Sequence, residues 1–157
     1  METPKLIFTL ELLETQNLIW GNLRLIYPDG RIVDYLATSG SRGWQSKDDL
    51  WARGRGPIPD GFDYQIPTTP YYLPTKGIEG NFFHITPDPV KQKNGNGTRA
   101  ELGIHYDANV PGSAGCIVLK NRDGFEGFCN RMKRLADNET KTLPLTINYL
   151  PLLSNLA

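Results

Sequence analysis

The sequence is poor in the residues that build disulfide and metal scaffolds. It contains two cysteines and two histidines among 157 residues. Two cysteines cannot form a disulfide framework, and these four residues lack the paired spacings of zinc modules. Lys and Arg together number 17, as do Asp and Glu, so the formal net charge is zero. Because phosphate backbones select basic proteins, we expect no nucleic-acid partner.

Long apolar stretches are also missing. No run approaches the roughly 20 apolar residues that cross a bilayer, so we expect no membrane span. Residues 1–16 have acidic residues inside a short apolar stretch, and no small-residue cleavage site follows a basic start. A cleavable signal peptide is therefore not visible.

Glycine and proline, by contrast, are frequent, with 16 Gly and 12 Pro spread along most of the chain. This distribution of turn-forming residues predicts many short segments joined by turns rather than a helical bundle. A chain of this length can bury a real core in one domain. Since neither internal repeats nor a linker divides the sequence, we expect a single domain over residues 1–157.

Alternating apolar, β-branched and aromatic residues predict strands along most of the chain. The turn Pro28-Asp29-Gly30 separates two apolar segments and predicts a hairpin within the first forty residues. Prolines between residues 57 and 74 predict an irregular surface excursion with one short strand at 64–66, and residues 91–98 read as a polar loop. The other predicted strands cover residues 6–12, 18–27, 31–36, 80–85, 102–105, 116–119 and 143–150.

One segment has the pattern of a helix. Between Asp123 and Ala136, apolar residues recur at spacings of three and four. We expect one amphipathic helix at about residues 122–136, with its apolar face packed on the sheet. The sequence therefore predicts a mostly β protein with one packed helix.

The segment that carries chemistry joins two predicted strands. His105 ends one strand, Cys116 begins the next, and a Pro-Gly loop lies between them. A thiol needs a base to become a nucleophile near neutral pH, because its unperturbed pKa is about 8.5. His105 is the candidate base. Gly115 allows close approach of a substrate backbone, and N–H groups near Ser113 to Cys116 could face a developing oxyanion, so acyl transfer through a thioester is predicted.

This segment resembles the L,D-transpeptidases of the YkuD type, whose signature is a histidine followed by Ser/Thr-X-Gly-Cys. The resemblance rests on His105 and Ser113-Ala114-Gly115-Cys116, and it extends over residues 119–123 and over 56–61 with Tyr64 and Ile66. Most members have a second histidine where this chain has Ala114, and their His-to-Cys spacing is longer. Both features are similar to the compact Ser-X-Gly-Cys branch, which includes secreted antibacterial effectors and phage-associated members.

The resemblance implies a β-sandwich or barrel-like YkuD-type fold, no metal or organic cofactor, and a peptidoglycan stem peptide as substrate. Cys116 would attack the carbonyl of a meso-diaminopimelate–D-Ala bond, and His105 would pass the thiol proton to the leaving amine. The acyl group then goes to water or to an amine, so L,D-carboxypeptidase, L,D-transpeptidase and D-amino-acid exchange activities all remain open.

The same resemblance implies action in the periplasm or the cell wall. Because no signal peptide is visible, we expect delivery by a non-classical route, a secretion system or a phage. If the protein is a secreted effector, an immunity protein would be its partner. We expect the enzyme itself to be a monomer.

Several residues have two interpretations. Arg99 resembles an arginine found ahead of the histidine in related chains and would hold a substrate carboxylate, or it is a solvated loop arginine. Asp107 orients the His105 imidazole or bonds its own backbone. Ser113 contacts substrate or fixes the turn, with Ala114 beside it as a substrate-binding position. His84 lines the substrate cleft or is a core or edge histidine.

Other interpretations concern the whole site. Cys129 lies on the apolar face of the predicted helix, so it is expected to be structural. A Cys116–Cys129 disulfide is the alternative, but it would silence the nucleophile. A zinc site built from both histidines and both cysteines matches no usual spacing. Papain-like and NlpC-type peptidases place the cysteine before the histidine, the reverse of the order here.

A non-catalytic wall-binding or virion structural domain remains the alternative, and the intact His, Gly and Cys set favours the enzyme. Aromatic residues form a sugar-stacking platform or belong to the core, namely Trp20, Trp44, Trp51, Tyr71 and Tyr72.

Overall fold

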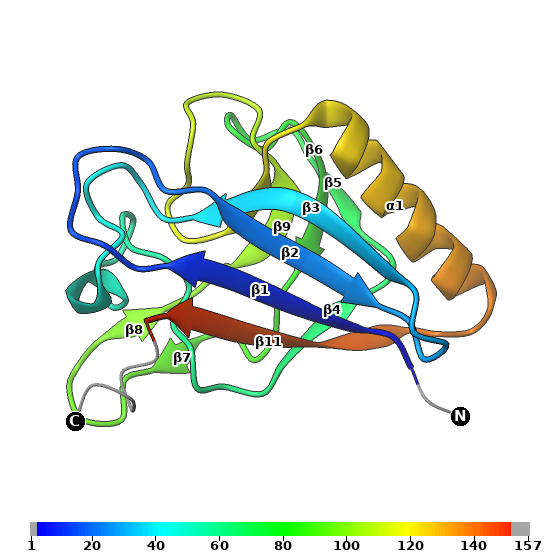
Figure 1. The fold of residues 1–157 in the computed structure, drawn as a ribbon, viewed down its shortest axis with the longest axis horizontal. Helices are drawn as coiled ribbons and strands as arrows, with labels where there is room; N and C mark the ends of the chain where they lie inside the picture. Colours follow the sequence, from blue (N-terminus) through cyan, green and yellow to red (C-terminus); the bar gives the residue numbers. More distant parts are fainter. Residues whose placement is uncertain (1–2, 152–157) are drawn as a thin grey trace.

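The computed structural model describes residues 3–151 and consists of a large curled sheet with one helix (Figure 1). Nine strands form the sheet in the order β4-β11-β1-β2-β3-β10-β9-β6-β5. The prediction of a mostly β protein with one helix is confirmed. The sheet strands are β1 (Lys5–Glu11), β2 (Gly21–Ile26), β3 (Ile32–Ser39), β4 (Tyr64–Pro67), β5 (Tyr71–Leu73), β6 (Gly80–His84), β9 (Gly103–Tyr106), β10 (Ile117–Leu119) and β11 (Thr142–Leu150). A separate hairpin pairs β7 (Val90–Lys91) with β8 (Thr98–Arg99), and the 3-10 helix η1 spans Lys47–Asp49.

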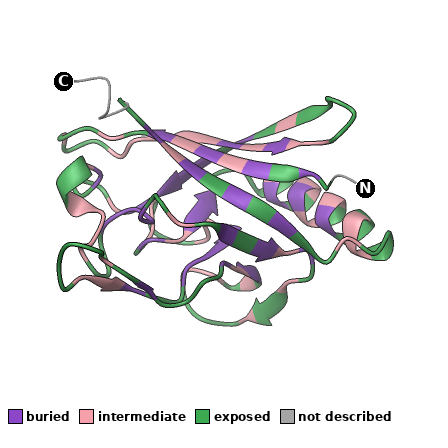
Figure 2. Ribbon diagram, turned by 90° about the horizontal axis from the view of Figure 1, so that it is seen from below, coloured by how far each residue is buried: buried purple, intermediate pink, exposed green. Residues whose placement is uncertain are grey.

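The long strands β1, β2 and β11 alternate buried and outward-facing residues, as strands with one core face do (Figure 2). Strands β1, β2 and β3 form the antiparallel meander that the first forty residues predict. The last strand, β11, returns to the start of the chain and pairs with β1 in parallel. In Figure 2 these long strands lie above the shorter ones, and both sets of strands carry buried positions, so the curled sheet encloses much of its own core.

The helix α1 (Arg122–Asp137) covers the sheet near β3, β9 and β10. Its buried residues are Phe125, Phe128 and Met132, which share one face because they are spaced by three and four. The Phe128 ring meets Phe83 of β6 edge-on, with ring centroids 5.2 Å apart. Both the position and the packing of the predicted helix are therefore confirmed.

The expectation of an irregular surface excursion over residues 57–74 is wrong. This segment supplies β4 and β5, the two edge strands of the large sheet, and the strand expected at 64–66 is β4. Ile58, Tyr64 and Ile66 are fully buried. Prolines are compatible with edge strands, since an edge strand has N–H positions that need no partner in the sheet. The polar loop at 91–98 is closed at its base by the β7–β8 hairpin.

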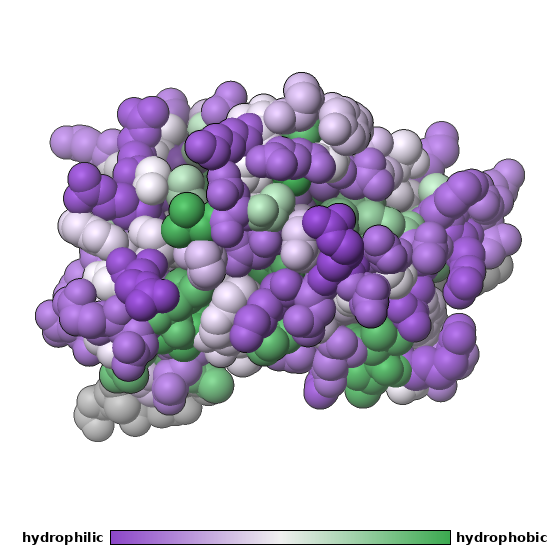
Figure 3. Space-filling model, turned by 90° about the horizontal axis from the view of Figure 1, so that it is seen from above, coloured by the Kyte–Doolittle hydropathy of each residue, from purple (hydrophilic) through white to green (hydrophobic). Residues whose placement is uncertain are grey.

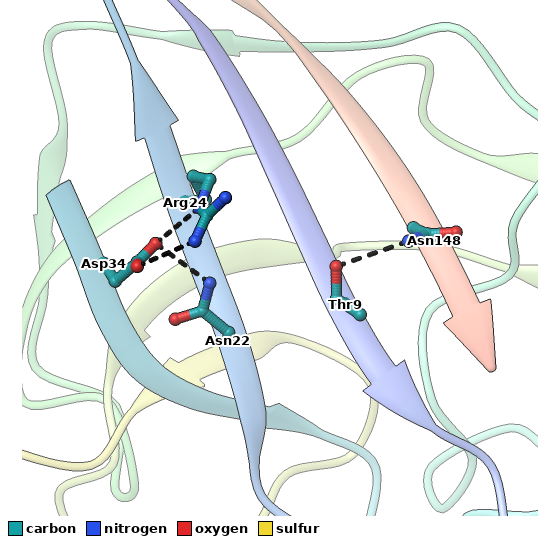
Figure 4. Close-up of polar contacts among 5 residues, drawn as sticks. All are labelled: Thr9, Asn22, Arg24, Asp34 and Asn148. Atoms are coloured by element: carbon teal, nitrogen blue, oxygen red, sulfur yellow. Dashed lines mark hydrogen bonds and ion pairs between the residues drawn. The ribbon is translucent and has the colours of Figure 1, made fainter. Parts of the chain in front are cut away.

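The surface of the described residues is mainly polar. On the face seen from above in Figure 3, small hydrophobic patches are separated by hydrophilic residues. On the outer face of the meander, Arg24 donates two hydrogen bonds to Asp34, at 2.8 Å and 3.0 Å (Figure 4). Asn22 donates a third to the same carboxylate at 3.0 Å. Within residues 3–151, no helix is long and apolar enough to cross a membrane.

Candidate functional site

Two neighbouring parallel strands bring the predicted nucleophile and base together. Strand β9 carries His105, and Cys116 directly precedes β10, whose Val118 is paired with His105. Side chains alternate along a strand, so Cys116 and His105 share one face of the sheet, displaced from each other by two residues. The opposite face, with Ile104 and Ile117, belongs to the buried core on the helix side. The segment between the strands folds back, and the Asp107 N–H donates to the Leu119 carbonyl at 3.0 Å.

The His105 imidazole is held in the tautomer that suits a general base. Its side chain is buried, with 6% of the residue exposed. Nδ1 lies 2.8 Å from the backbone oxygen of Tyr106. A carbonyl only accepts hydrogen bonds, so Nδ1 carries the proton and Nε2 is the basic nitrogen. Burial lowers the pKa of His105, and the bond to Tyr106 acts in the opposite direction. The ring is therefore neutral at pH 7.

The Cys116 thiol is half-buried and protonated. Its Sγ atom lies 3.7 Å from the backbone oxygen of Glu101 and donates to it. Burial raises the pKa of Cys116 to about 11, although the Gly103 N–H and the Arg99 guanidinium lower it. Within residues 3–151 the thiol forms no hydrogen bond with His105. The pair thus consists of a neutral thiol and a neutral imidazole.

Cys116 lies between two pockets. The first, which we call the His105 pocket, has a volume of about 340 Å³ and is lined by both His105 and Cys116, together with the loops that carry Lys76 and Val110. The second, the His84 pocket, has a volume of about 480 Å³ and is lined by Cys116 and His84. A larger pocket of about 600 Å³ lies at the start of α1 and contains none of these residues. We therefore assign the candidate site to the two pockets that share Cys116.

In the turn before Cys116, the serine of the Ser-X-Gly-Cys motif forms hydrogen bonds with backbone groups. Ser113 Oγ donates to the Cys116 carbonyl at 2.6 Å and accepts from the N–H groups of Gly40 and Gly115 at 3.1 Å and 3.2 Å. Ser113 therefore fixes the turn. Its own N–H donates to the Gly40 carbonyl. Within the described chain, the N–H groups of Ala114 and Cys116 form no hydrogen bond with another residue, so they are the candidate oxyanion donors.

Arg99 is buried behind this turn. Its Nη1 donates to the carbonyls of Leu50 and Pro57, at 2.6 Å and 3.0 Å. Its Nη2 donates to those of Gly56 and Ala114, at 2.9 Å and 2.8 Å. Burial lowers its pKa. Because both terminal nitrogens are occupied, the geometry favours a positioning role for Arg99, and its predicted contact with a substrate carboxylate would require displacement of these bonds.

Asp107 bonds the backbone of its own loop. Its Oδ2 accepts from the Gly112 N–H at 3.0 Å, and burial raises its pKa. The hydrogen bond at Nδ1 of His105 goes to the Tyr106 carbonyl instead. Of the two interpretations of Asp107, the structure thus supports the turn rather than orientation of the imidazole.

His84 opens into the second pocket and has a partner that the sequence did not reveal. Its Nε2 lies 2.6 Å from Asp88 Oδ2, while Asp88 Oδ1 accepts from the Glu101 N–H at 3.1 Å. Glu101 has a φ of 59°, a left-handed conformation that few side chains favour, and its carbonyl is the acceptor of the Cys116 thiol. Asp88 therefore connects His84 to the peptide beside the nucleophile. Spacing alone gave no signal for this, because the contact between Asp88 and Glu101 spans thirteen residues.

Apart from Tyr71, the remaining candidates lie outside this site. Both cysteines are free, and the Cys129 thiol faces Asn81 Nδ2 at 3.8 Å. Among residues 3–151, no group of three or more His, Cys, Asp and Glu side chains is placed to hold a metal ion. The tryptophans have separate surroundings: Trp51 packs on Phe62, Trp44 lies under Arg55, and Trp20 lies under Lys120. Tyr71 lies in the His84 pocket, and Tyr72 is exposed.

Comparison of the chain with family models, with curated proteins and with solved structures finds no match.

Proposed function

We propose that this protein is a cysteine-dependent acyl-transfer enzyme that acts on peptidoglycan stem peptides through a Cys116 thioester, with His105 as the base. One observation carries the proposal. Cys116, directly before β10, and His105, on the adjacent strand β9, line the same pocket, and the hydrogen bond from Nδ1 to Tyr106 leaves Nε2 as the basic nitrogen.

The protonation states favour a mechanism in which proton transfer accompanies attack. The thiol of Cys116 attacks the carbonyl carbon while His105 Nε2 takes the thiol proton. The developing oxyanion faces the N–H groups of Ala114 and Cys116, and one such donor is worth roughly 3–4 kcal/mol of barrier. The C–N bond then breaks, and His105 gives its proton to the leaving amine. A raised thiol pKa is compatible with this order of steps, since no stable thiolate is required.

The substrate class follows from the resemblance of His105 and Ser113–Cys116 to the YkuD-type L,D-transpeptidases. The donor would be a tetrapeptide stem, and the leaving group would be D-alanine. Lys76 lines the His105 pocket and offers a positive charge for the terminal carboxylate of that residue. Such a substrate implies action in the periplasm or cell wall, after delivery by a non-classical route, a secretion system or a phage.

Purified disaccharide-tetrapeptides and mass spectrometry test this function. Release of D-alanine alone indicates a carboxypeptidase, incorporation of an added D-amino acid indicates exchange, and 3–3 cross-linked dimers indicate transpeptidation. Cys116→Ala is the control, and every product should disappear with it. The proposal fails if the wild-type protein forms none of these products, or if Cys116→Ala forms them at the same rate.

A non-catalytic wall-binding or virion structural domain is the second candidate. It is favoured by the high pKa of Cys116, about 11, and by the thiol's hydrogen bond to Glu101 rather than to His105. Calorimetric titration with the same muropeptides separates the two functions. A binding domain would retain affinity in Cys116→Ala and would leave the muropeptides intact, whereas the enzyme would convert them.

A further inference from the structure

The His84 pocket contains an imidazole–carboxylate pair that the mechanism above does not use. His84 Nε2 lies 2.6 Å from Asp88 Oδ2. An ionised carboxylate only accepts hydrogen bonds, so Nε2 carries the proton and Nδ1 is the basic nitrogen of the ring. Within residues 3–151, Nδ1 forms no hydrogen bond. His84 is thus a second base with an orienting carboxylate, on an imidazole that is about one-third exposed, at 32%.

This second base stands on the same side of the sheet as the first. The Phe82 ring lies between the two imidazoles, with centroid distances of 6.3 Å to His84 and 6.0 Å to His105 and interplanar angles of 27° and 26°. Phe82 is buried, so it separates the rings with an apolar wall. The two histidines therefore open into different pockets that meet at Cys116.

The two pockets differ in charge. The His84 pocket is lined by Asp88 and Glu101, and no Lys or Arg is among its described lining residues. The His105 pocket is lined by Lys76, and no Asp or Glu is among its described lining residues. Opposite charges attract most strongly where water is partly excluded. The His84 pocket is thus suited to a cationic group, and the His105 pocket to a carboxylate.

We propose that the His84 pocket binds the amine that accepts the acyl group, and that the His84–Asp88 pair deprotonates its ammonium group. This inference rests on the proposed function. It follows from a difference between amines and water: an ammonium must lose two protons to become an amide, whereas water must lose one to become a carboxylic acid. Primary amines are protonated near pH 7, so aminolysis needs one more proton acceptor than hydrolysis.

The steps balance with the two bases in the structure. His84 Nδ1 takes the first proton from the ammonium and later releases it to solvent. The neutral amine attacks the thioester carbonyl, a C–N bond forms, and the C–S bond breaks. His105 takes the second proton from the attacking nitrogen and gives it to the departing Cys116 thiolate. Hydrolysis uses His105 alone, because water has a single proton to give up.

The test compares two amines as acceptors. The enzyme is incubated at pH 7 with disaccharide-tetrapeptide and one of two amines that differ from the leaving D-alanine. Methylamine is an ammonium ion at this pH and carries no carboxylate, whereas hydroxylamine is already neutral. Mass spectrometry gives the ratio of amine product to hydrolysed tripeptide. We expect His84→Gln to lower this ratio about 10²-fold with methylamine, as is typical for loss of a general base. The ratio with hydroxylamine and the rate of thioester formation should not change.

Two further variants complete the design. Asp88→Asn keeps an acceptor for the Glu101 N–H but removes the charge, so it should also lower the methylamine ratio. Tyr72→Phe, on the exposed side of the neighbouring strand β5, is the matched control and should behave as wild type. Raising the pH should restore aminolysis by His84→Gln, because more methylamine is then neutral.

Each other outcome has a defined meaning. Equal losses with both amines would indicate that His84 only shapes the pocket, and would overturn the inference. An unchanged methylamine ratio in His84→Gln and Asp88→Asn would also overturn it. Wild-type enzyme that hydrolyses the tetrapeptide but uses neither amine would overturn the acceptor assignment and leave the proposed function intact. Wild-type enzyme that releases no D-alanine would overturn both.

Discussion

A Cβ atom at position 115 would lie 2.3 Å from the Nη2 atom of Arg99. That guanidinium cannot withdraw easily, since its terminal nitrogens donate to four backbone carbonyls. Gly115 also has a φ of 141°, which L side chains rarely adopt. The glycine before the nucleophile is therefore required by the arginine behind it.

Gly115→Ala should consequently be destabilising as well as inactivating. We expect the free energy of unfolding to fall by about 3 kcal/mol, from backbone strain and overpacking together. Chemical denaturation measures this. Gly54→Ala is the matched control, because Gly54 has a φ of 76° but nothing within 4 Å of an added Cβ, and strain alone should cost about 1 kcal/mol. Equal losses of unfolding free energy in the two variants would show that the Arg99 side chain moves away from the new methyl group.

Arg99→Lys tests whether the arginine positions the site or binds substrate. Lysine has one compact charge and cannot reproduce the fork that reaches the carbonyls of Leu50, Pro57, Gly56 and Ala114. We expect a loss of about 3 kcal/mol in unfolding free energy, because charged hydrogen bonds to buried carbonyls are lost. Arg42→Lys, at an exposed position, is the control. Unchanged stability with a raised KM would instead support the contact with a substrate carboxylate.

Asp107→Asn separates a structural carboxylate from a catalytic one. The amide oxygen of asparagine can still accept from the Gly112 N–H, so the loop should keep its shape. We expect the rate of D-alanine release to stay within the same order of magnitude. If Asp107 oriented the base, the substitution should cost about 10⁴-fold in kcat, as it does in a Ser-His-Asp triad. The muropeptide assay decides between these results.

The sequence predicted the features that depend on neighbouring residues. The helix at residues 122–137 follows from a spacing of three and four, and the meander of the first forty residues follows from alternation and a Pro-Asp-Gly turn. The proximity of His105 and Cys116 also has a local origin, since ten residues separate two strands.

Other features depend on contacts between distant backbone groups. Arg99 binds carbonyls that lie 42 to 49 residues away in three of its four bonds. Every residue type has a carbonyl, so no side-chain pattern marks such partners. The same holds for Asp88, whose effect on Cys116 passes through the backbone of Glu101. The short strand expected at 64–66 is β4, but the strand at residues 71–73 was missed because the neighbouring prolines outweighed its apolar residues.

The thiol pKa predicts slow alkylation of Cys116 at neutral pH. Burial favours the uncharged thiol, so the thiolate population should rise only toward pH 11. Iodoacetamide labelling followed by peptide mass spectrometry gives the rate at Cys116 from pH 6 to 10. We expect this rate to increase throughout the range. A plateau below pH 7 would instead reveal a preformed thiolate–imidazolium pair.

The pH dependence of D-alanine release should report His105. The base must be neutral to accept the thiol proton, and burial shifts its pKa below the ordinary value of 6.5. Protonation therefore begins at lower pH than for an exposed histidine, and kcat/KM should stay level as the pH falls to 6.5 and decline below it. His105→Asn keeps a donor for the Tyr106 carbonyl but has no basic nitrogen, so it should lose about 10²-fold or more in rate. If the decline of kcat/KM in the wild type were centred above pH 6.5, a group other than His105 would be responsible for it.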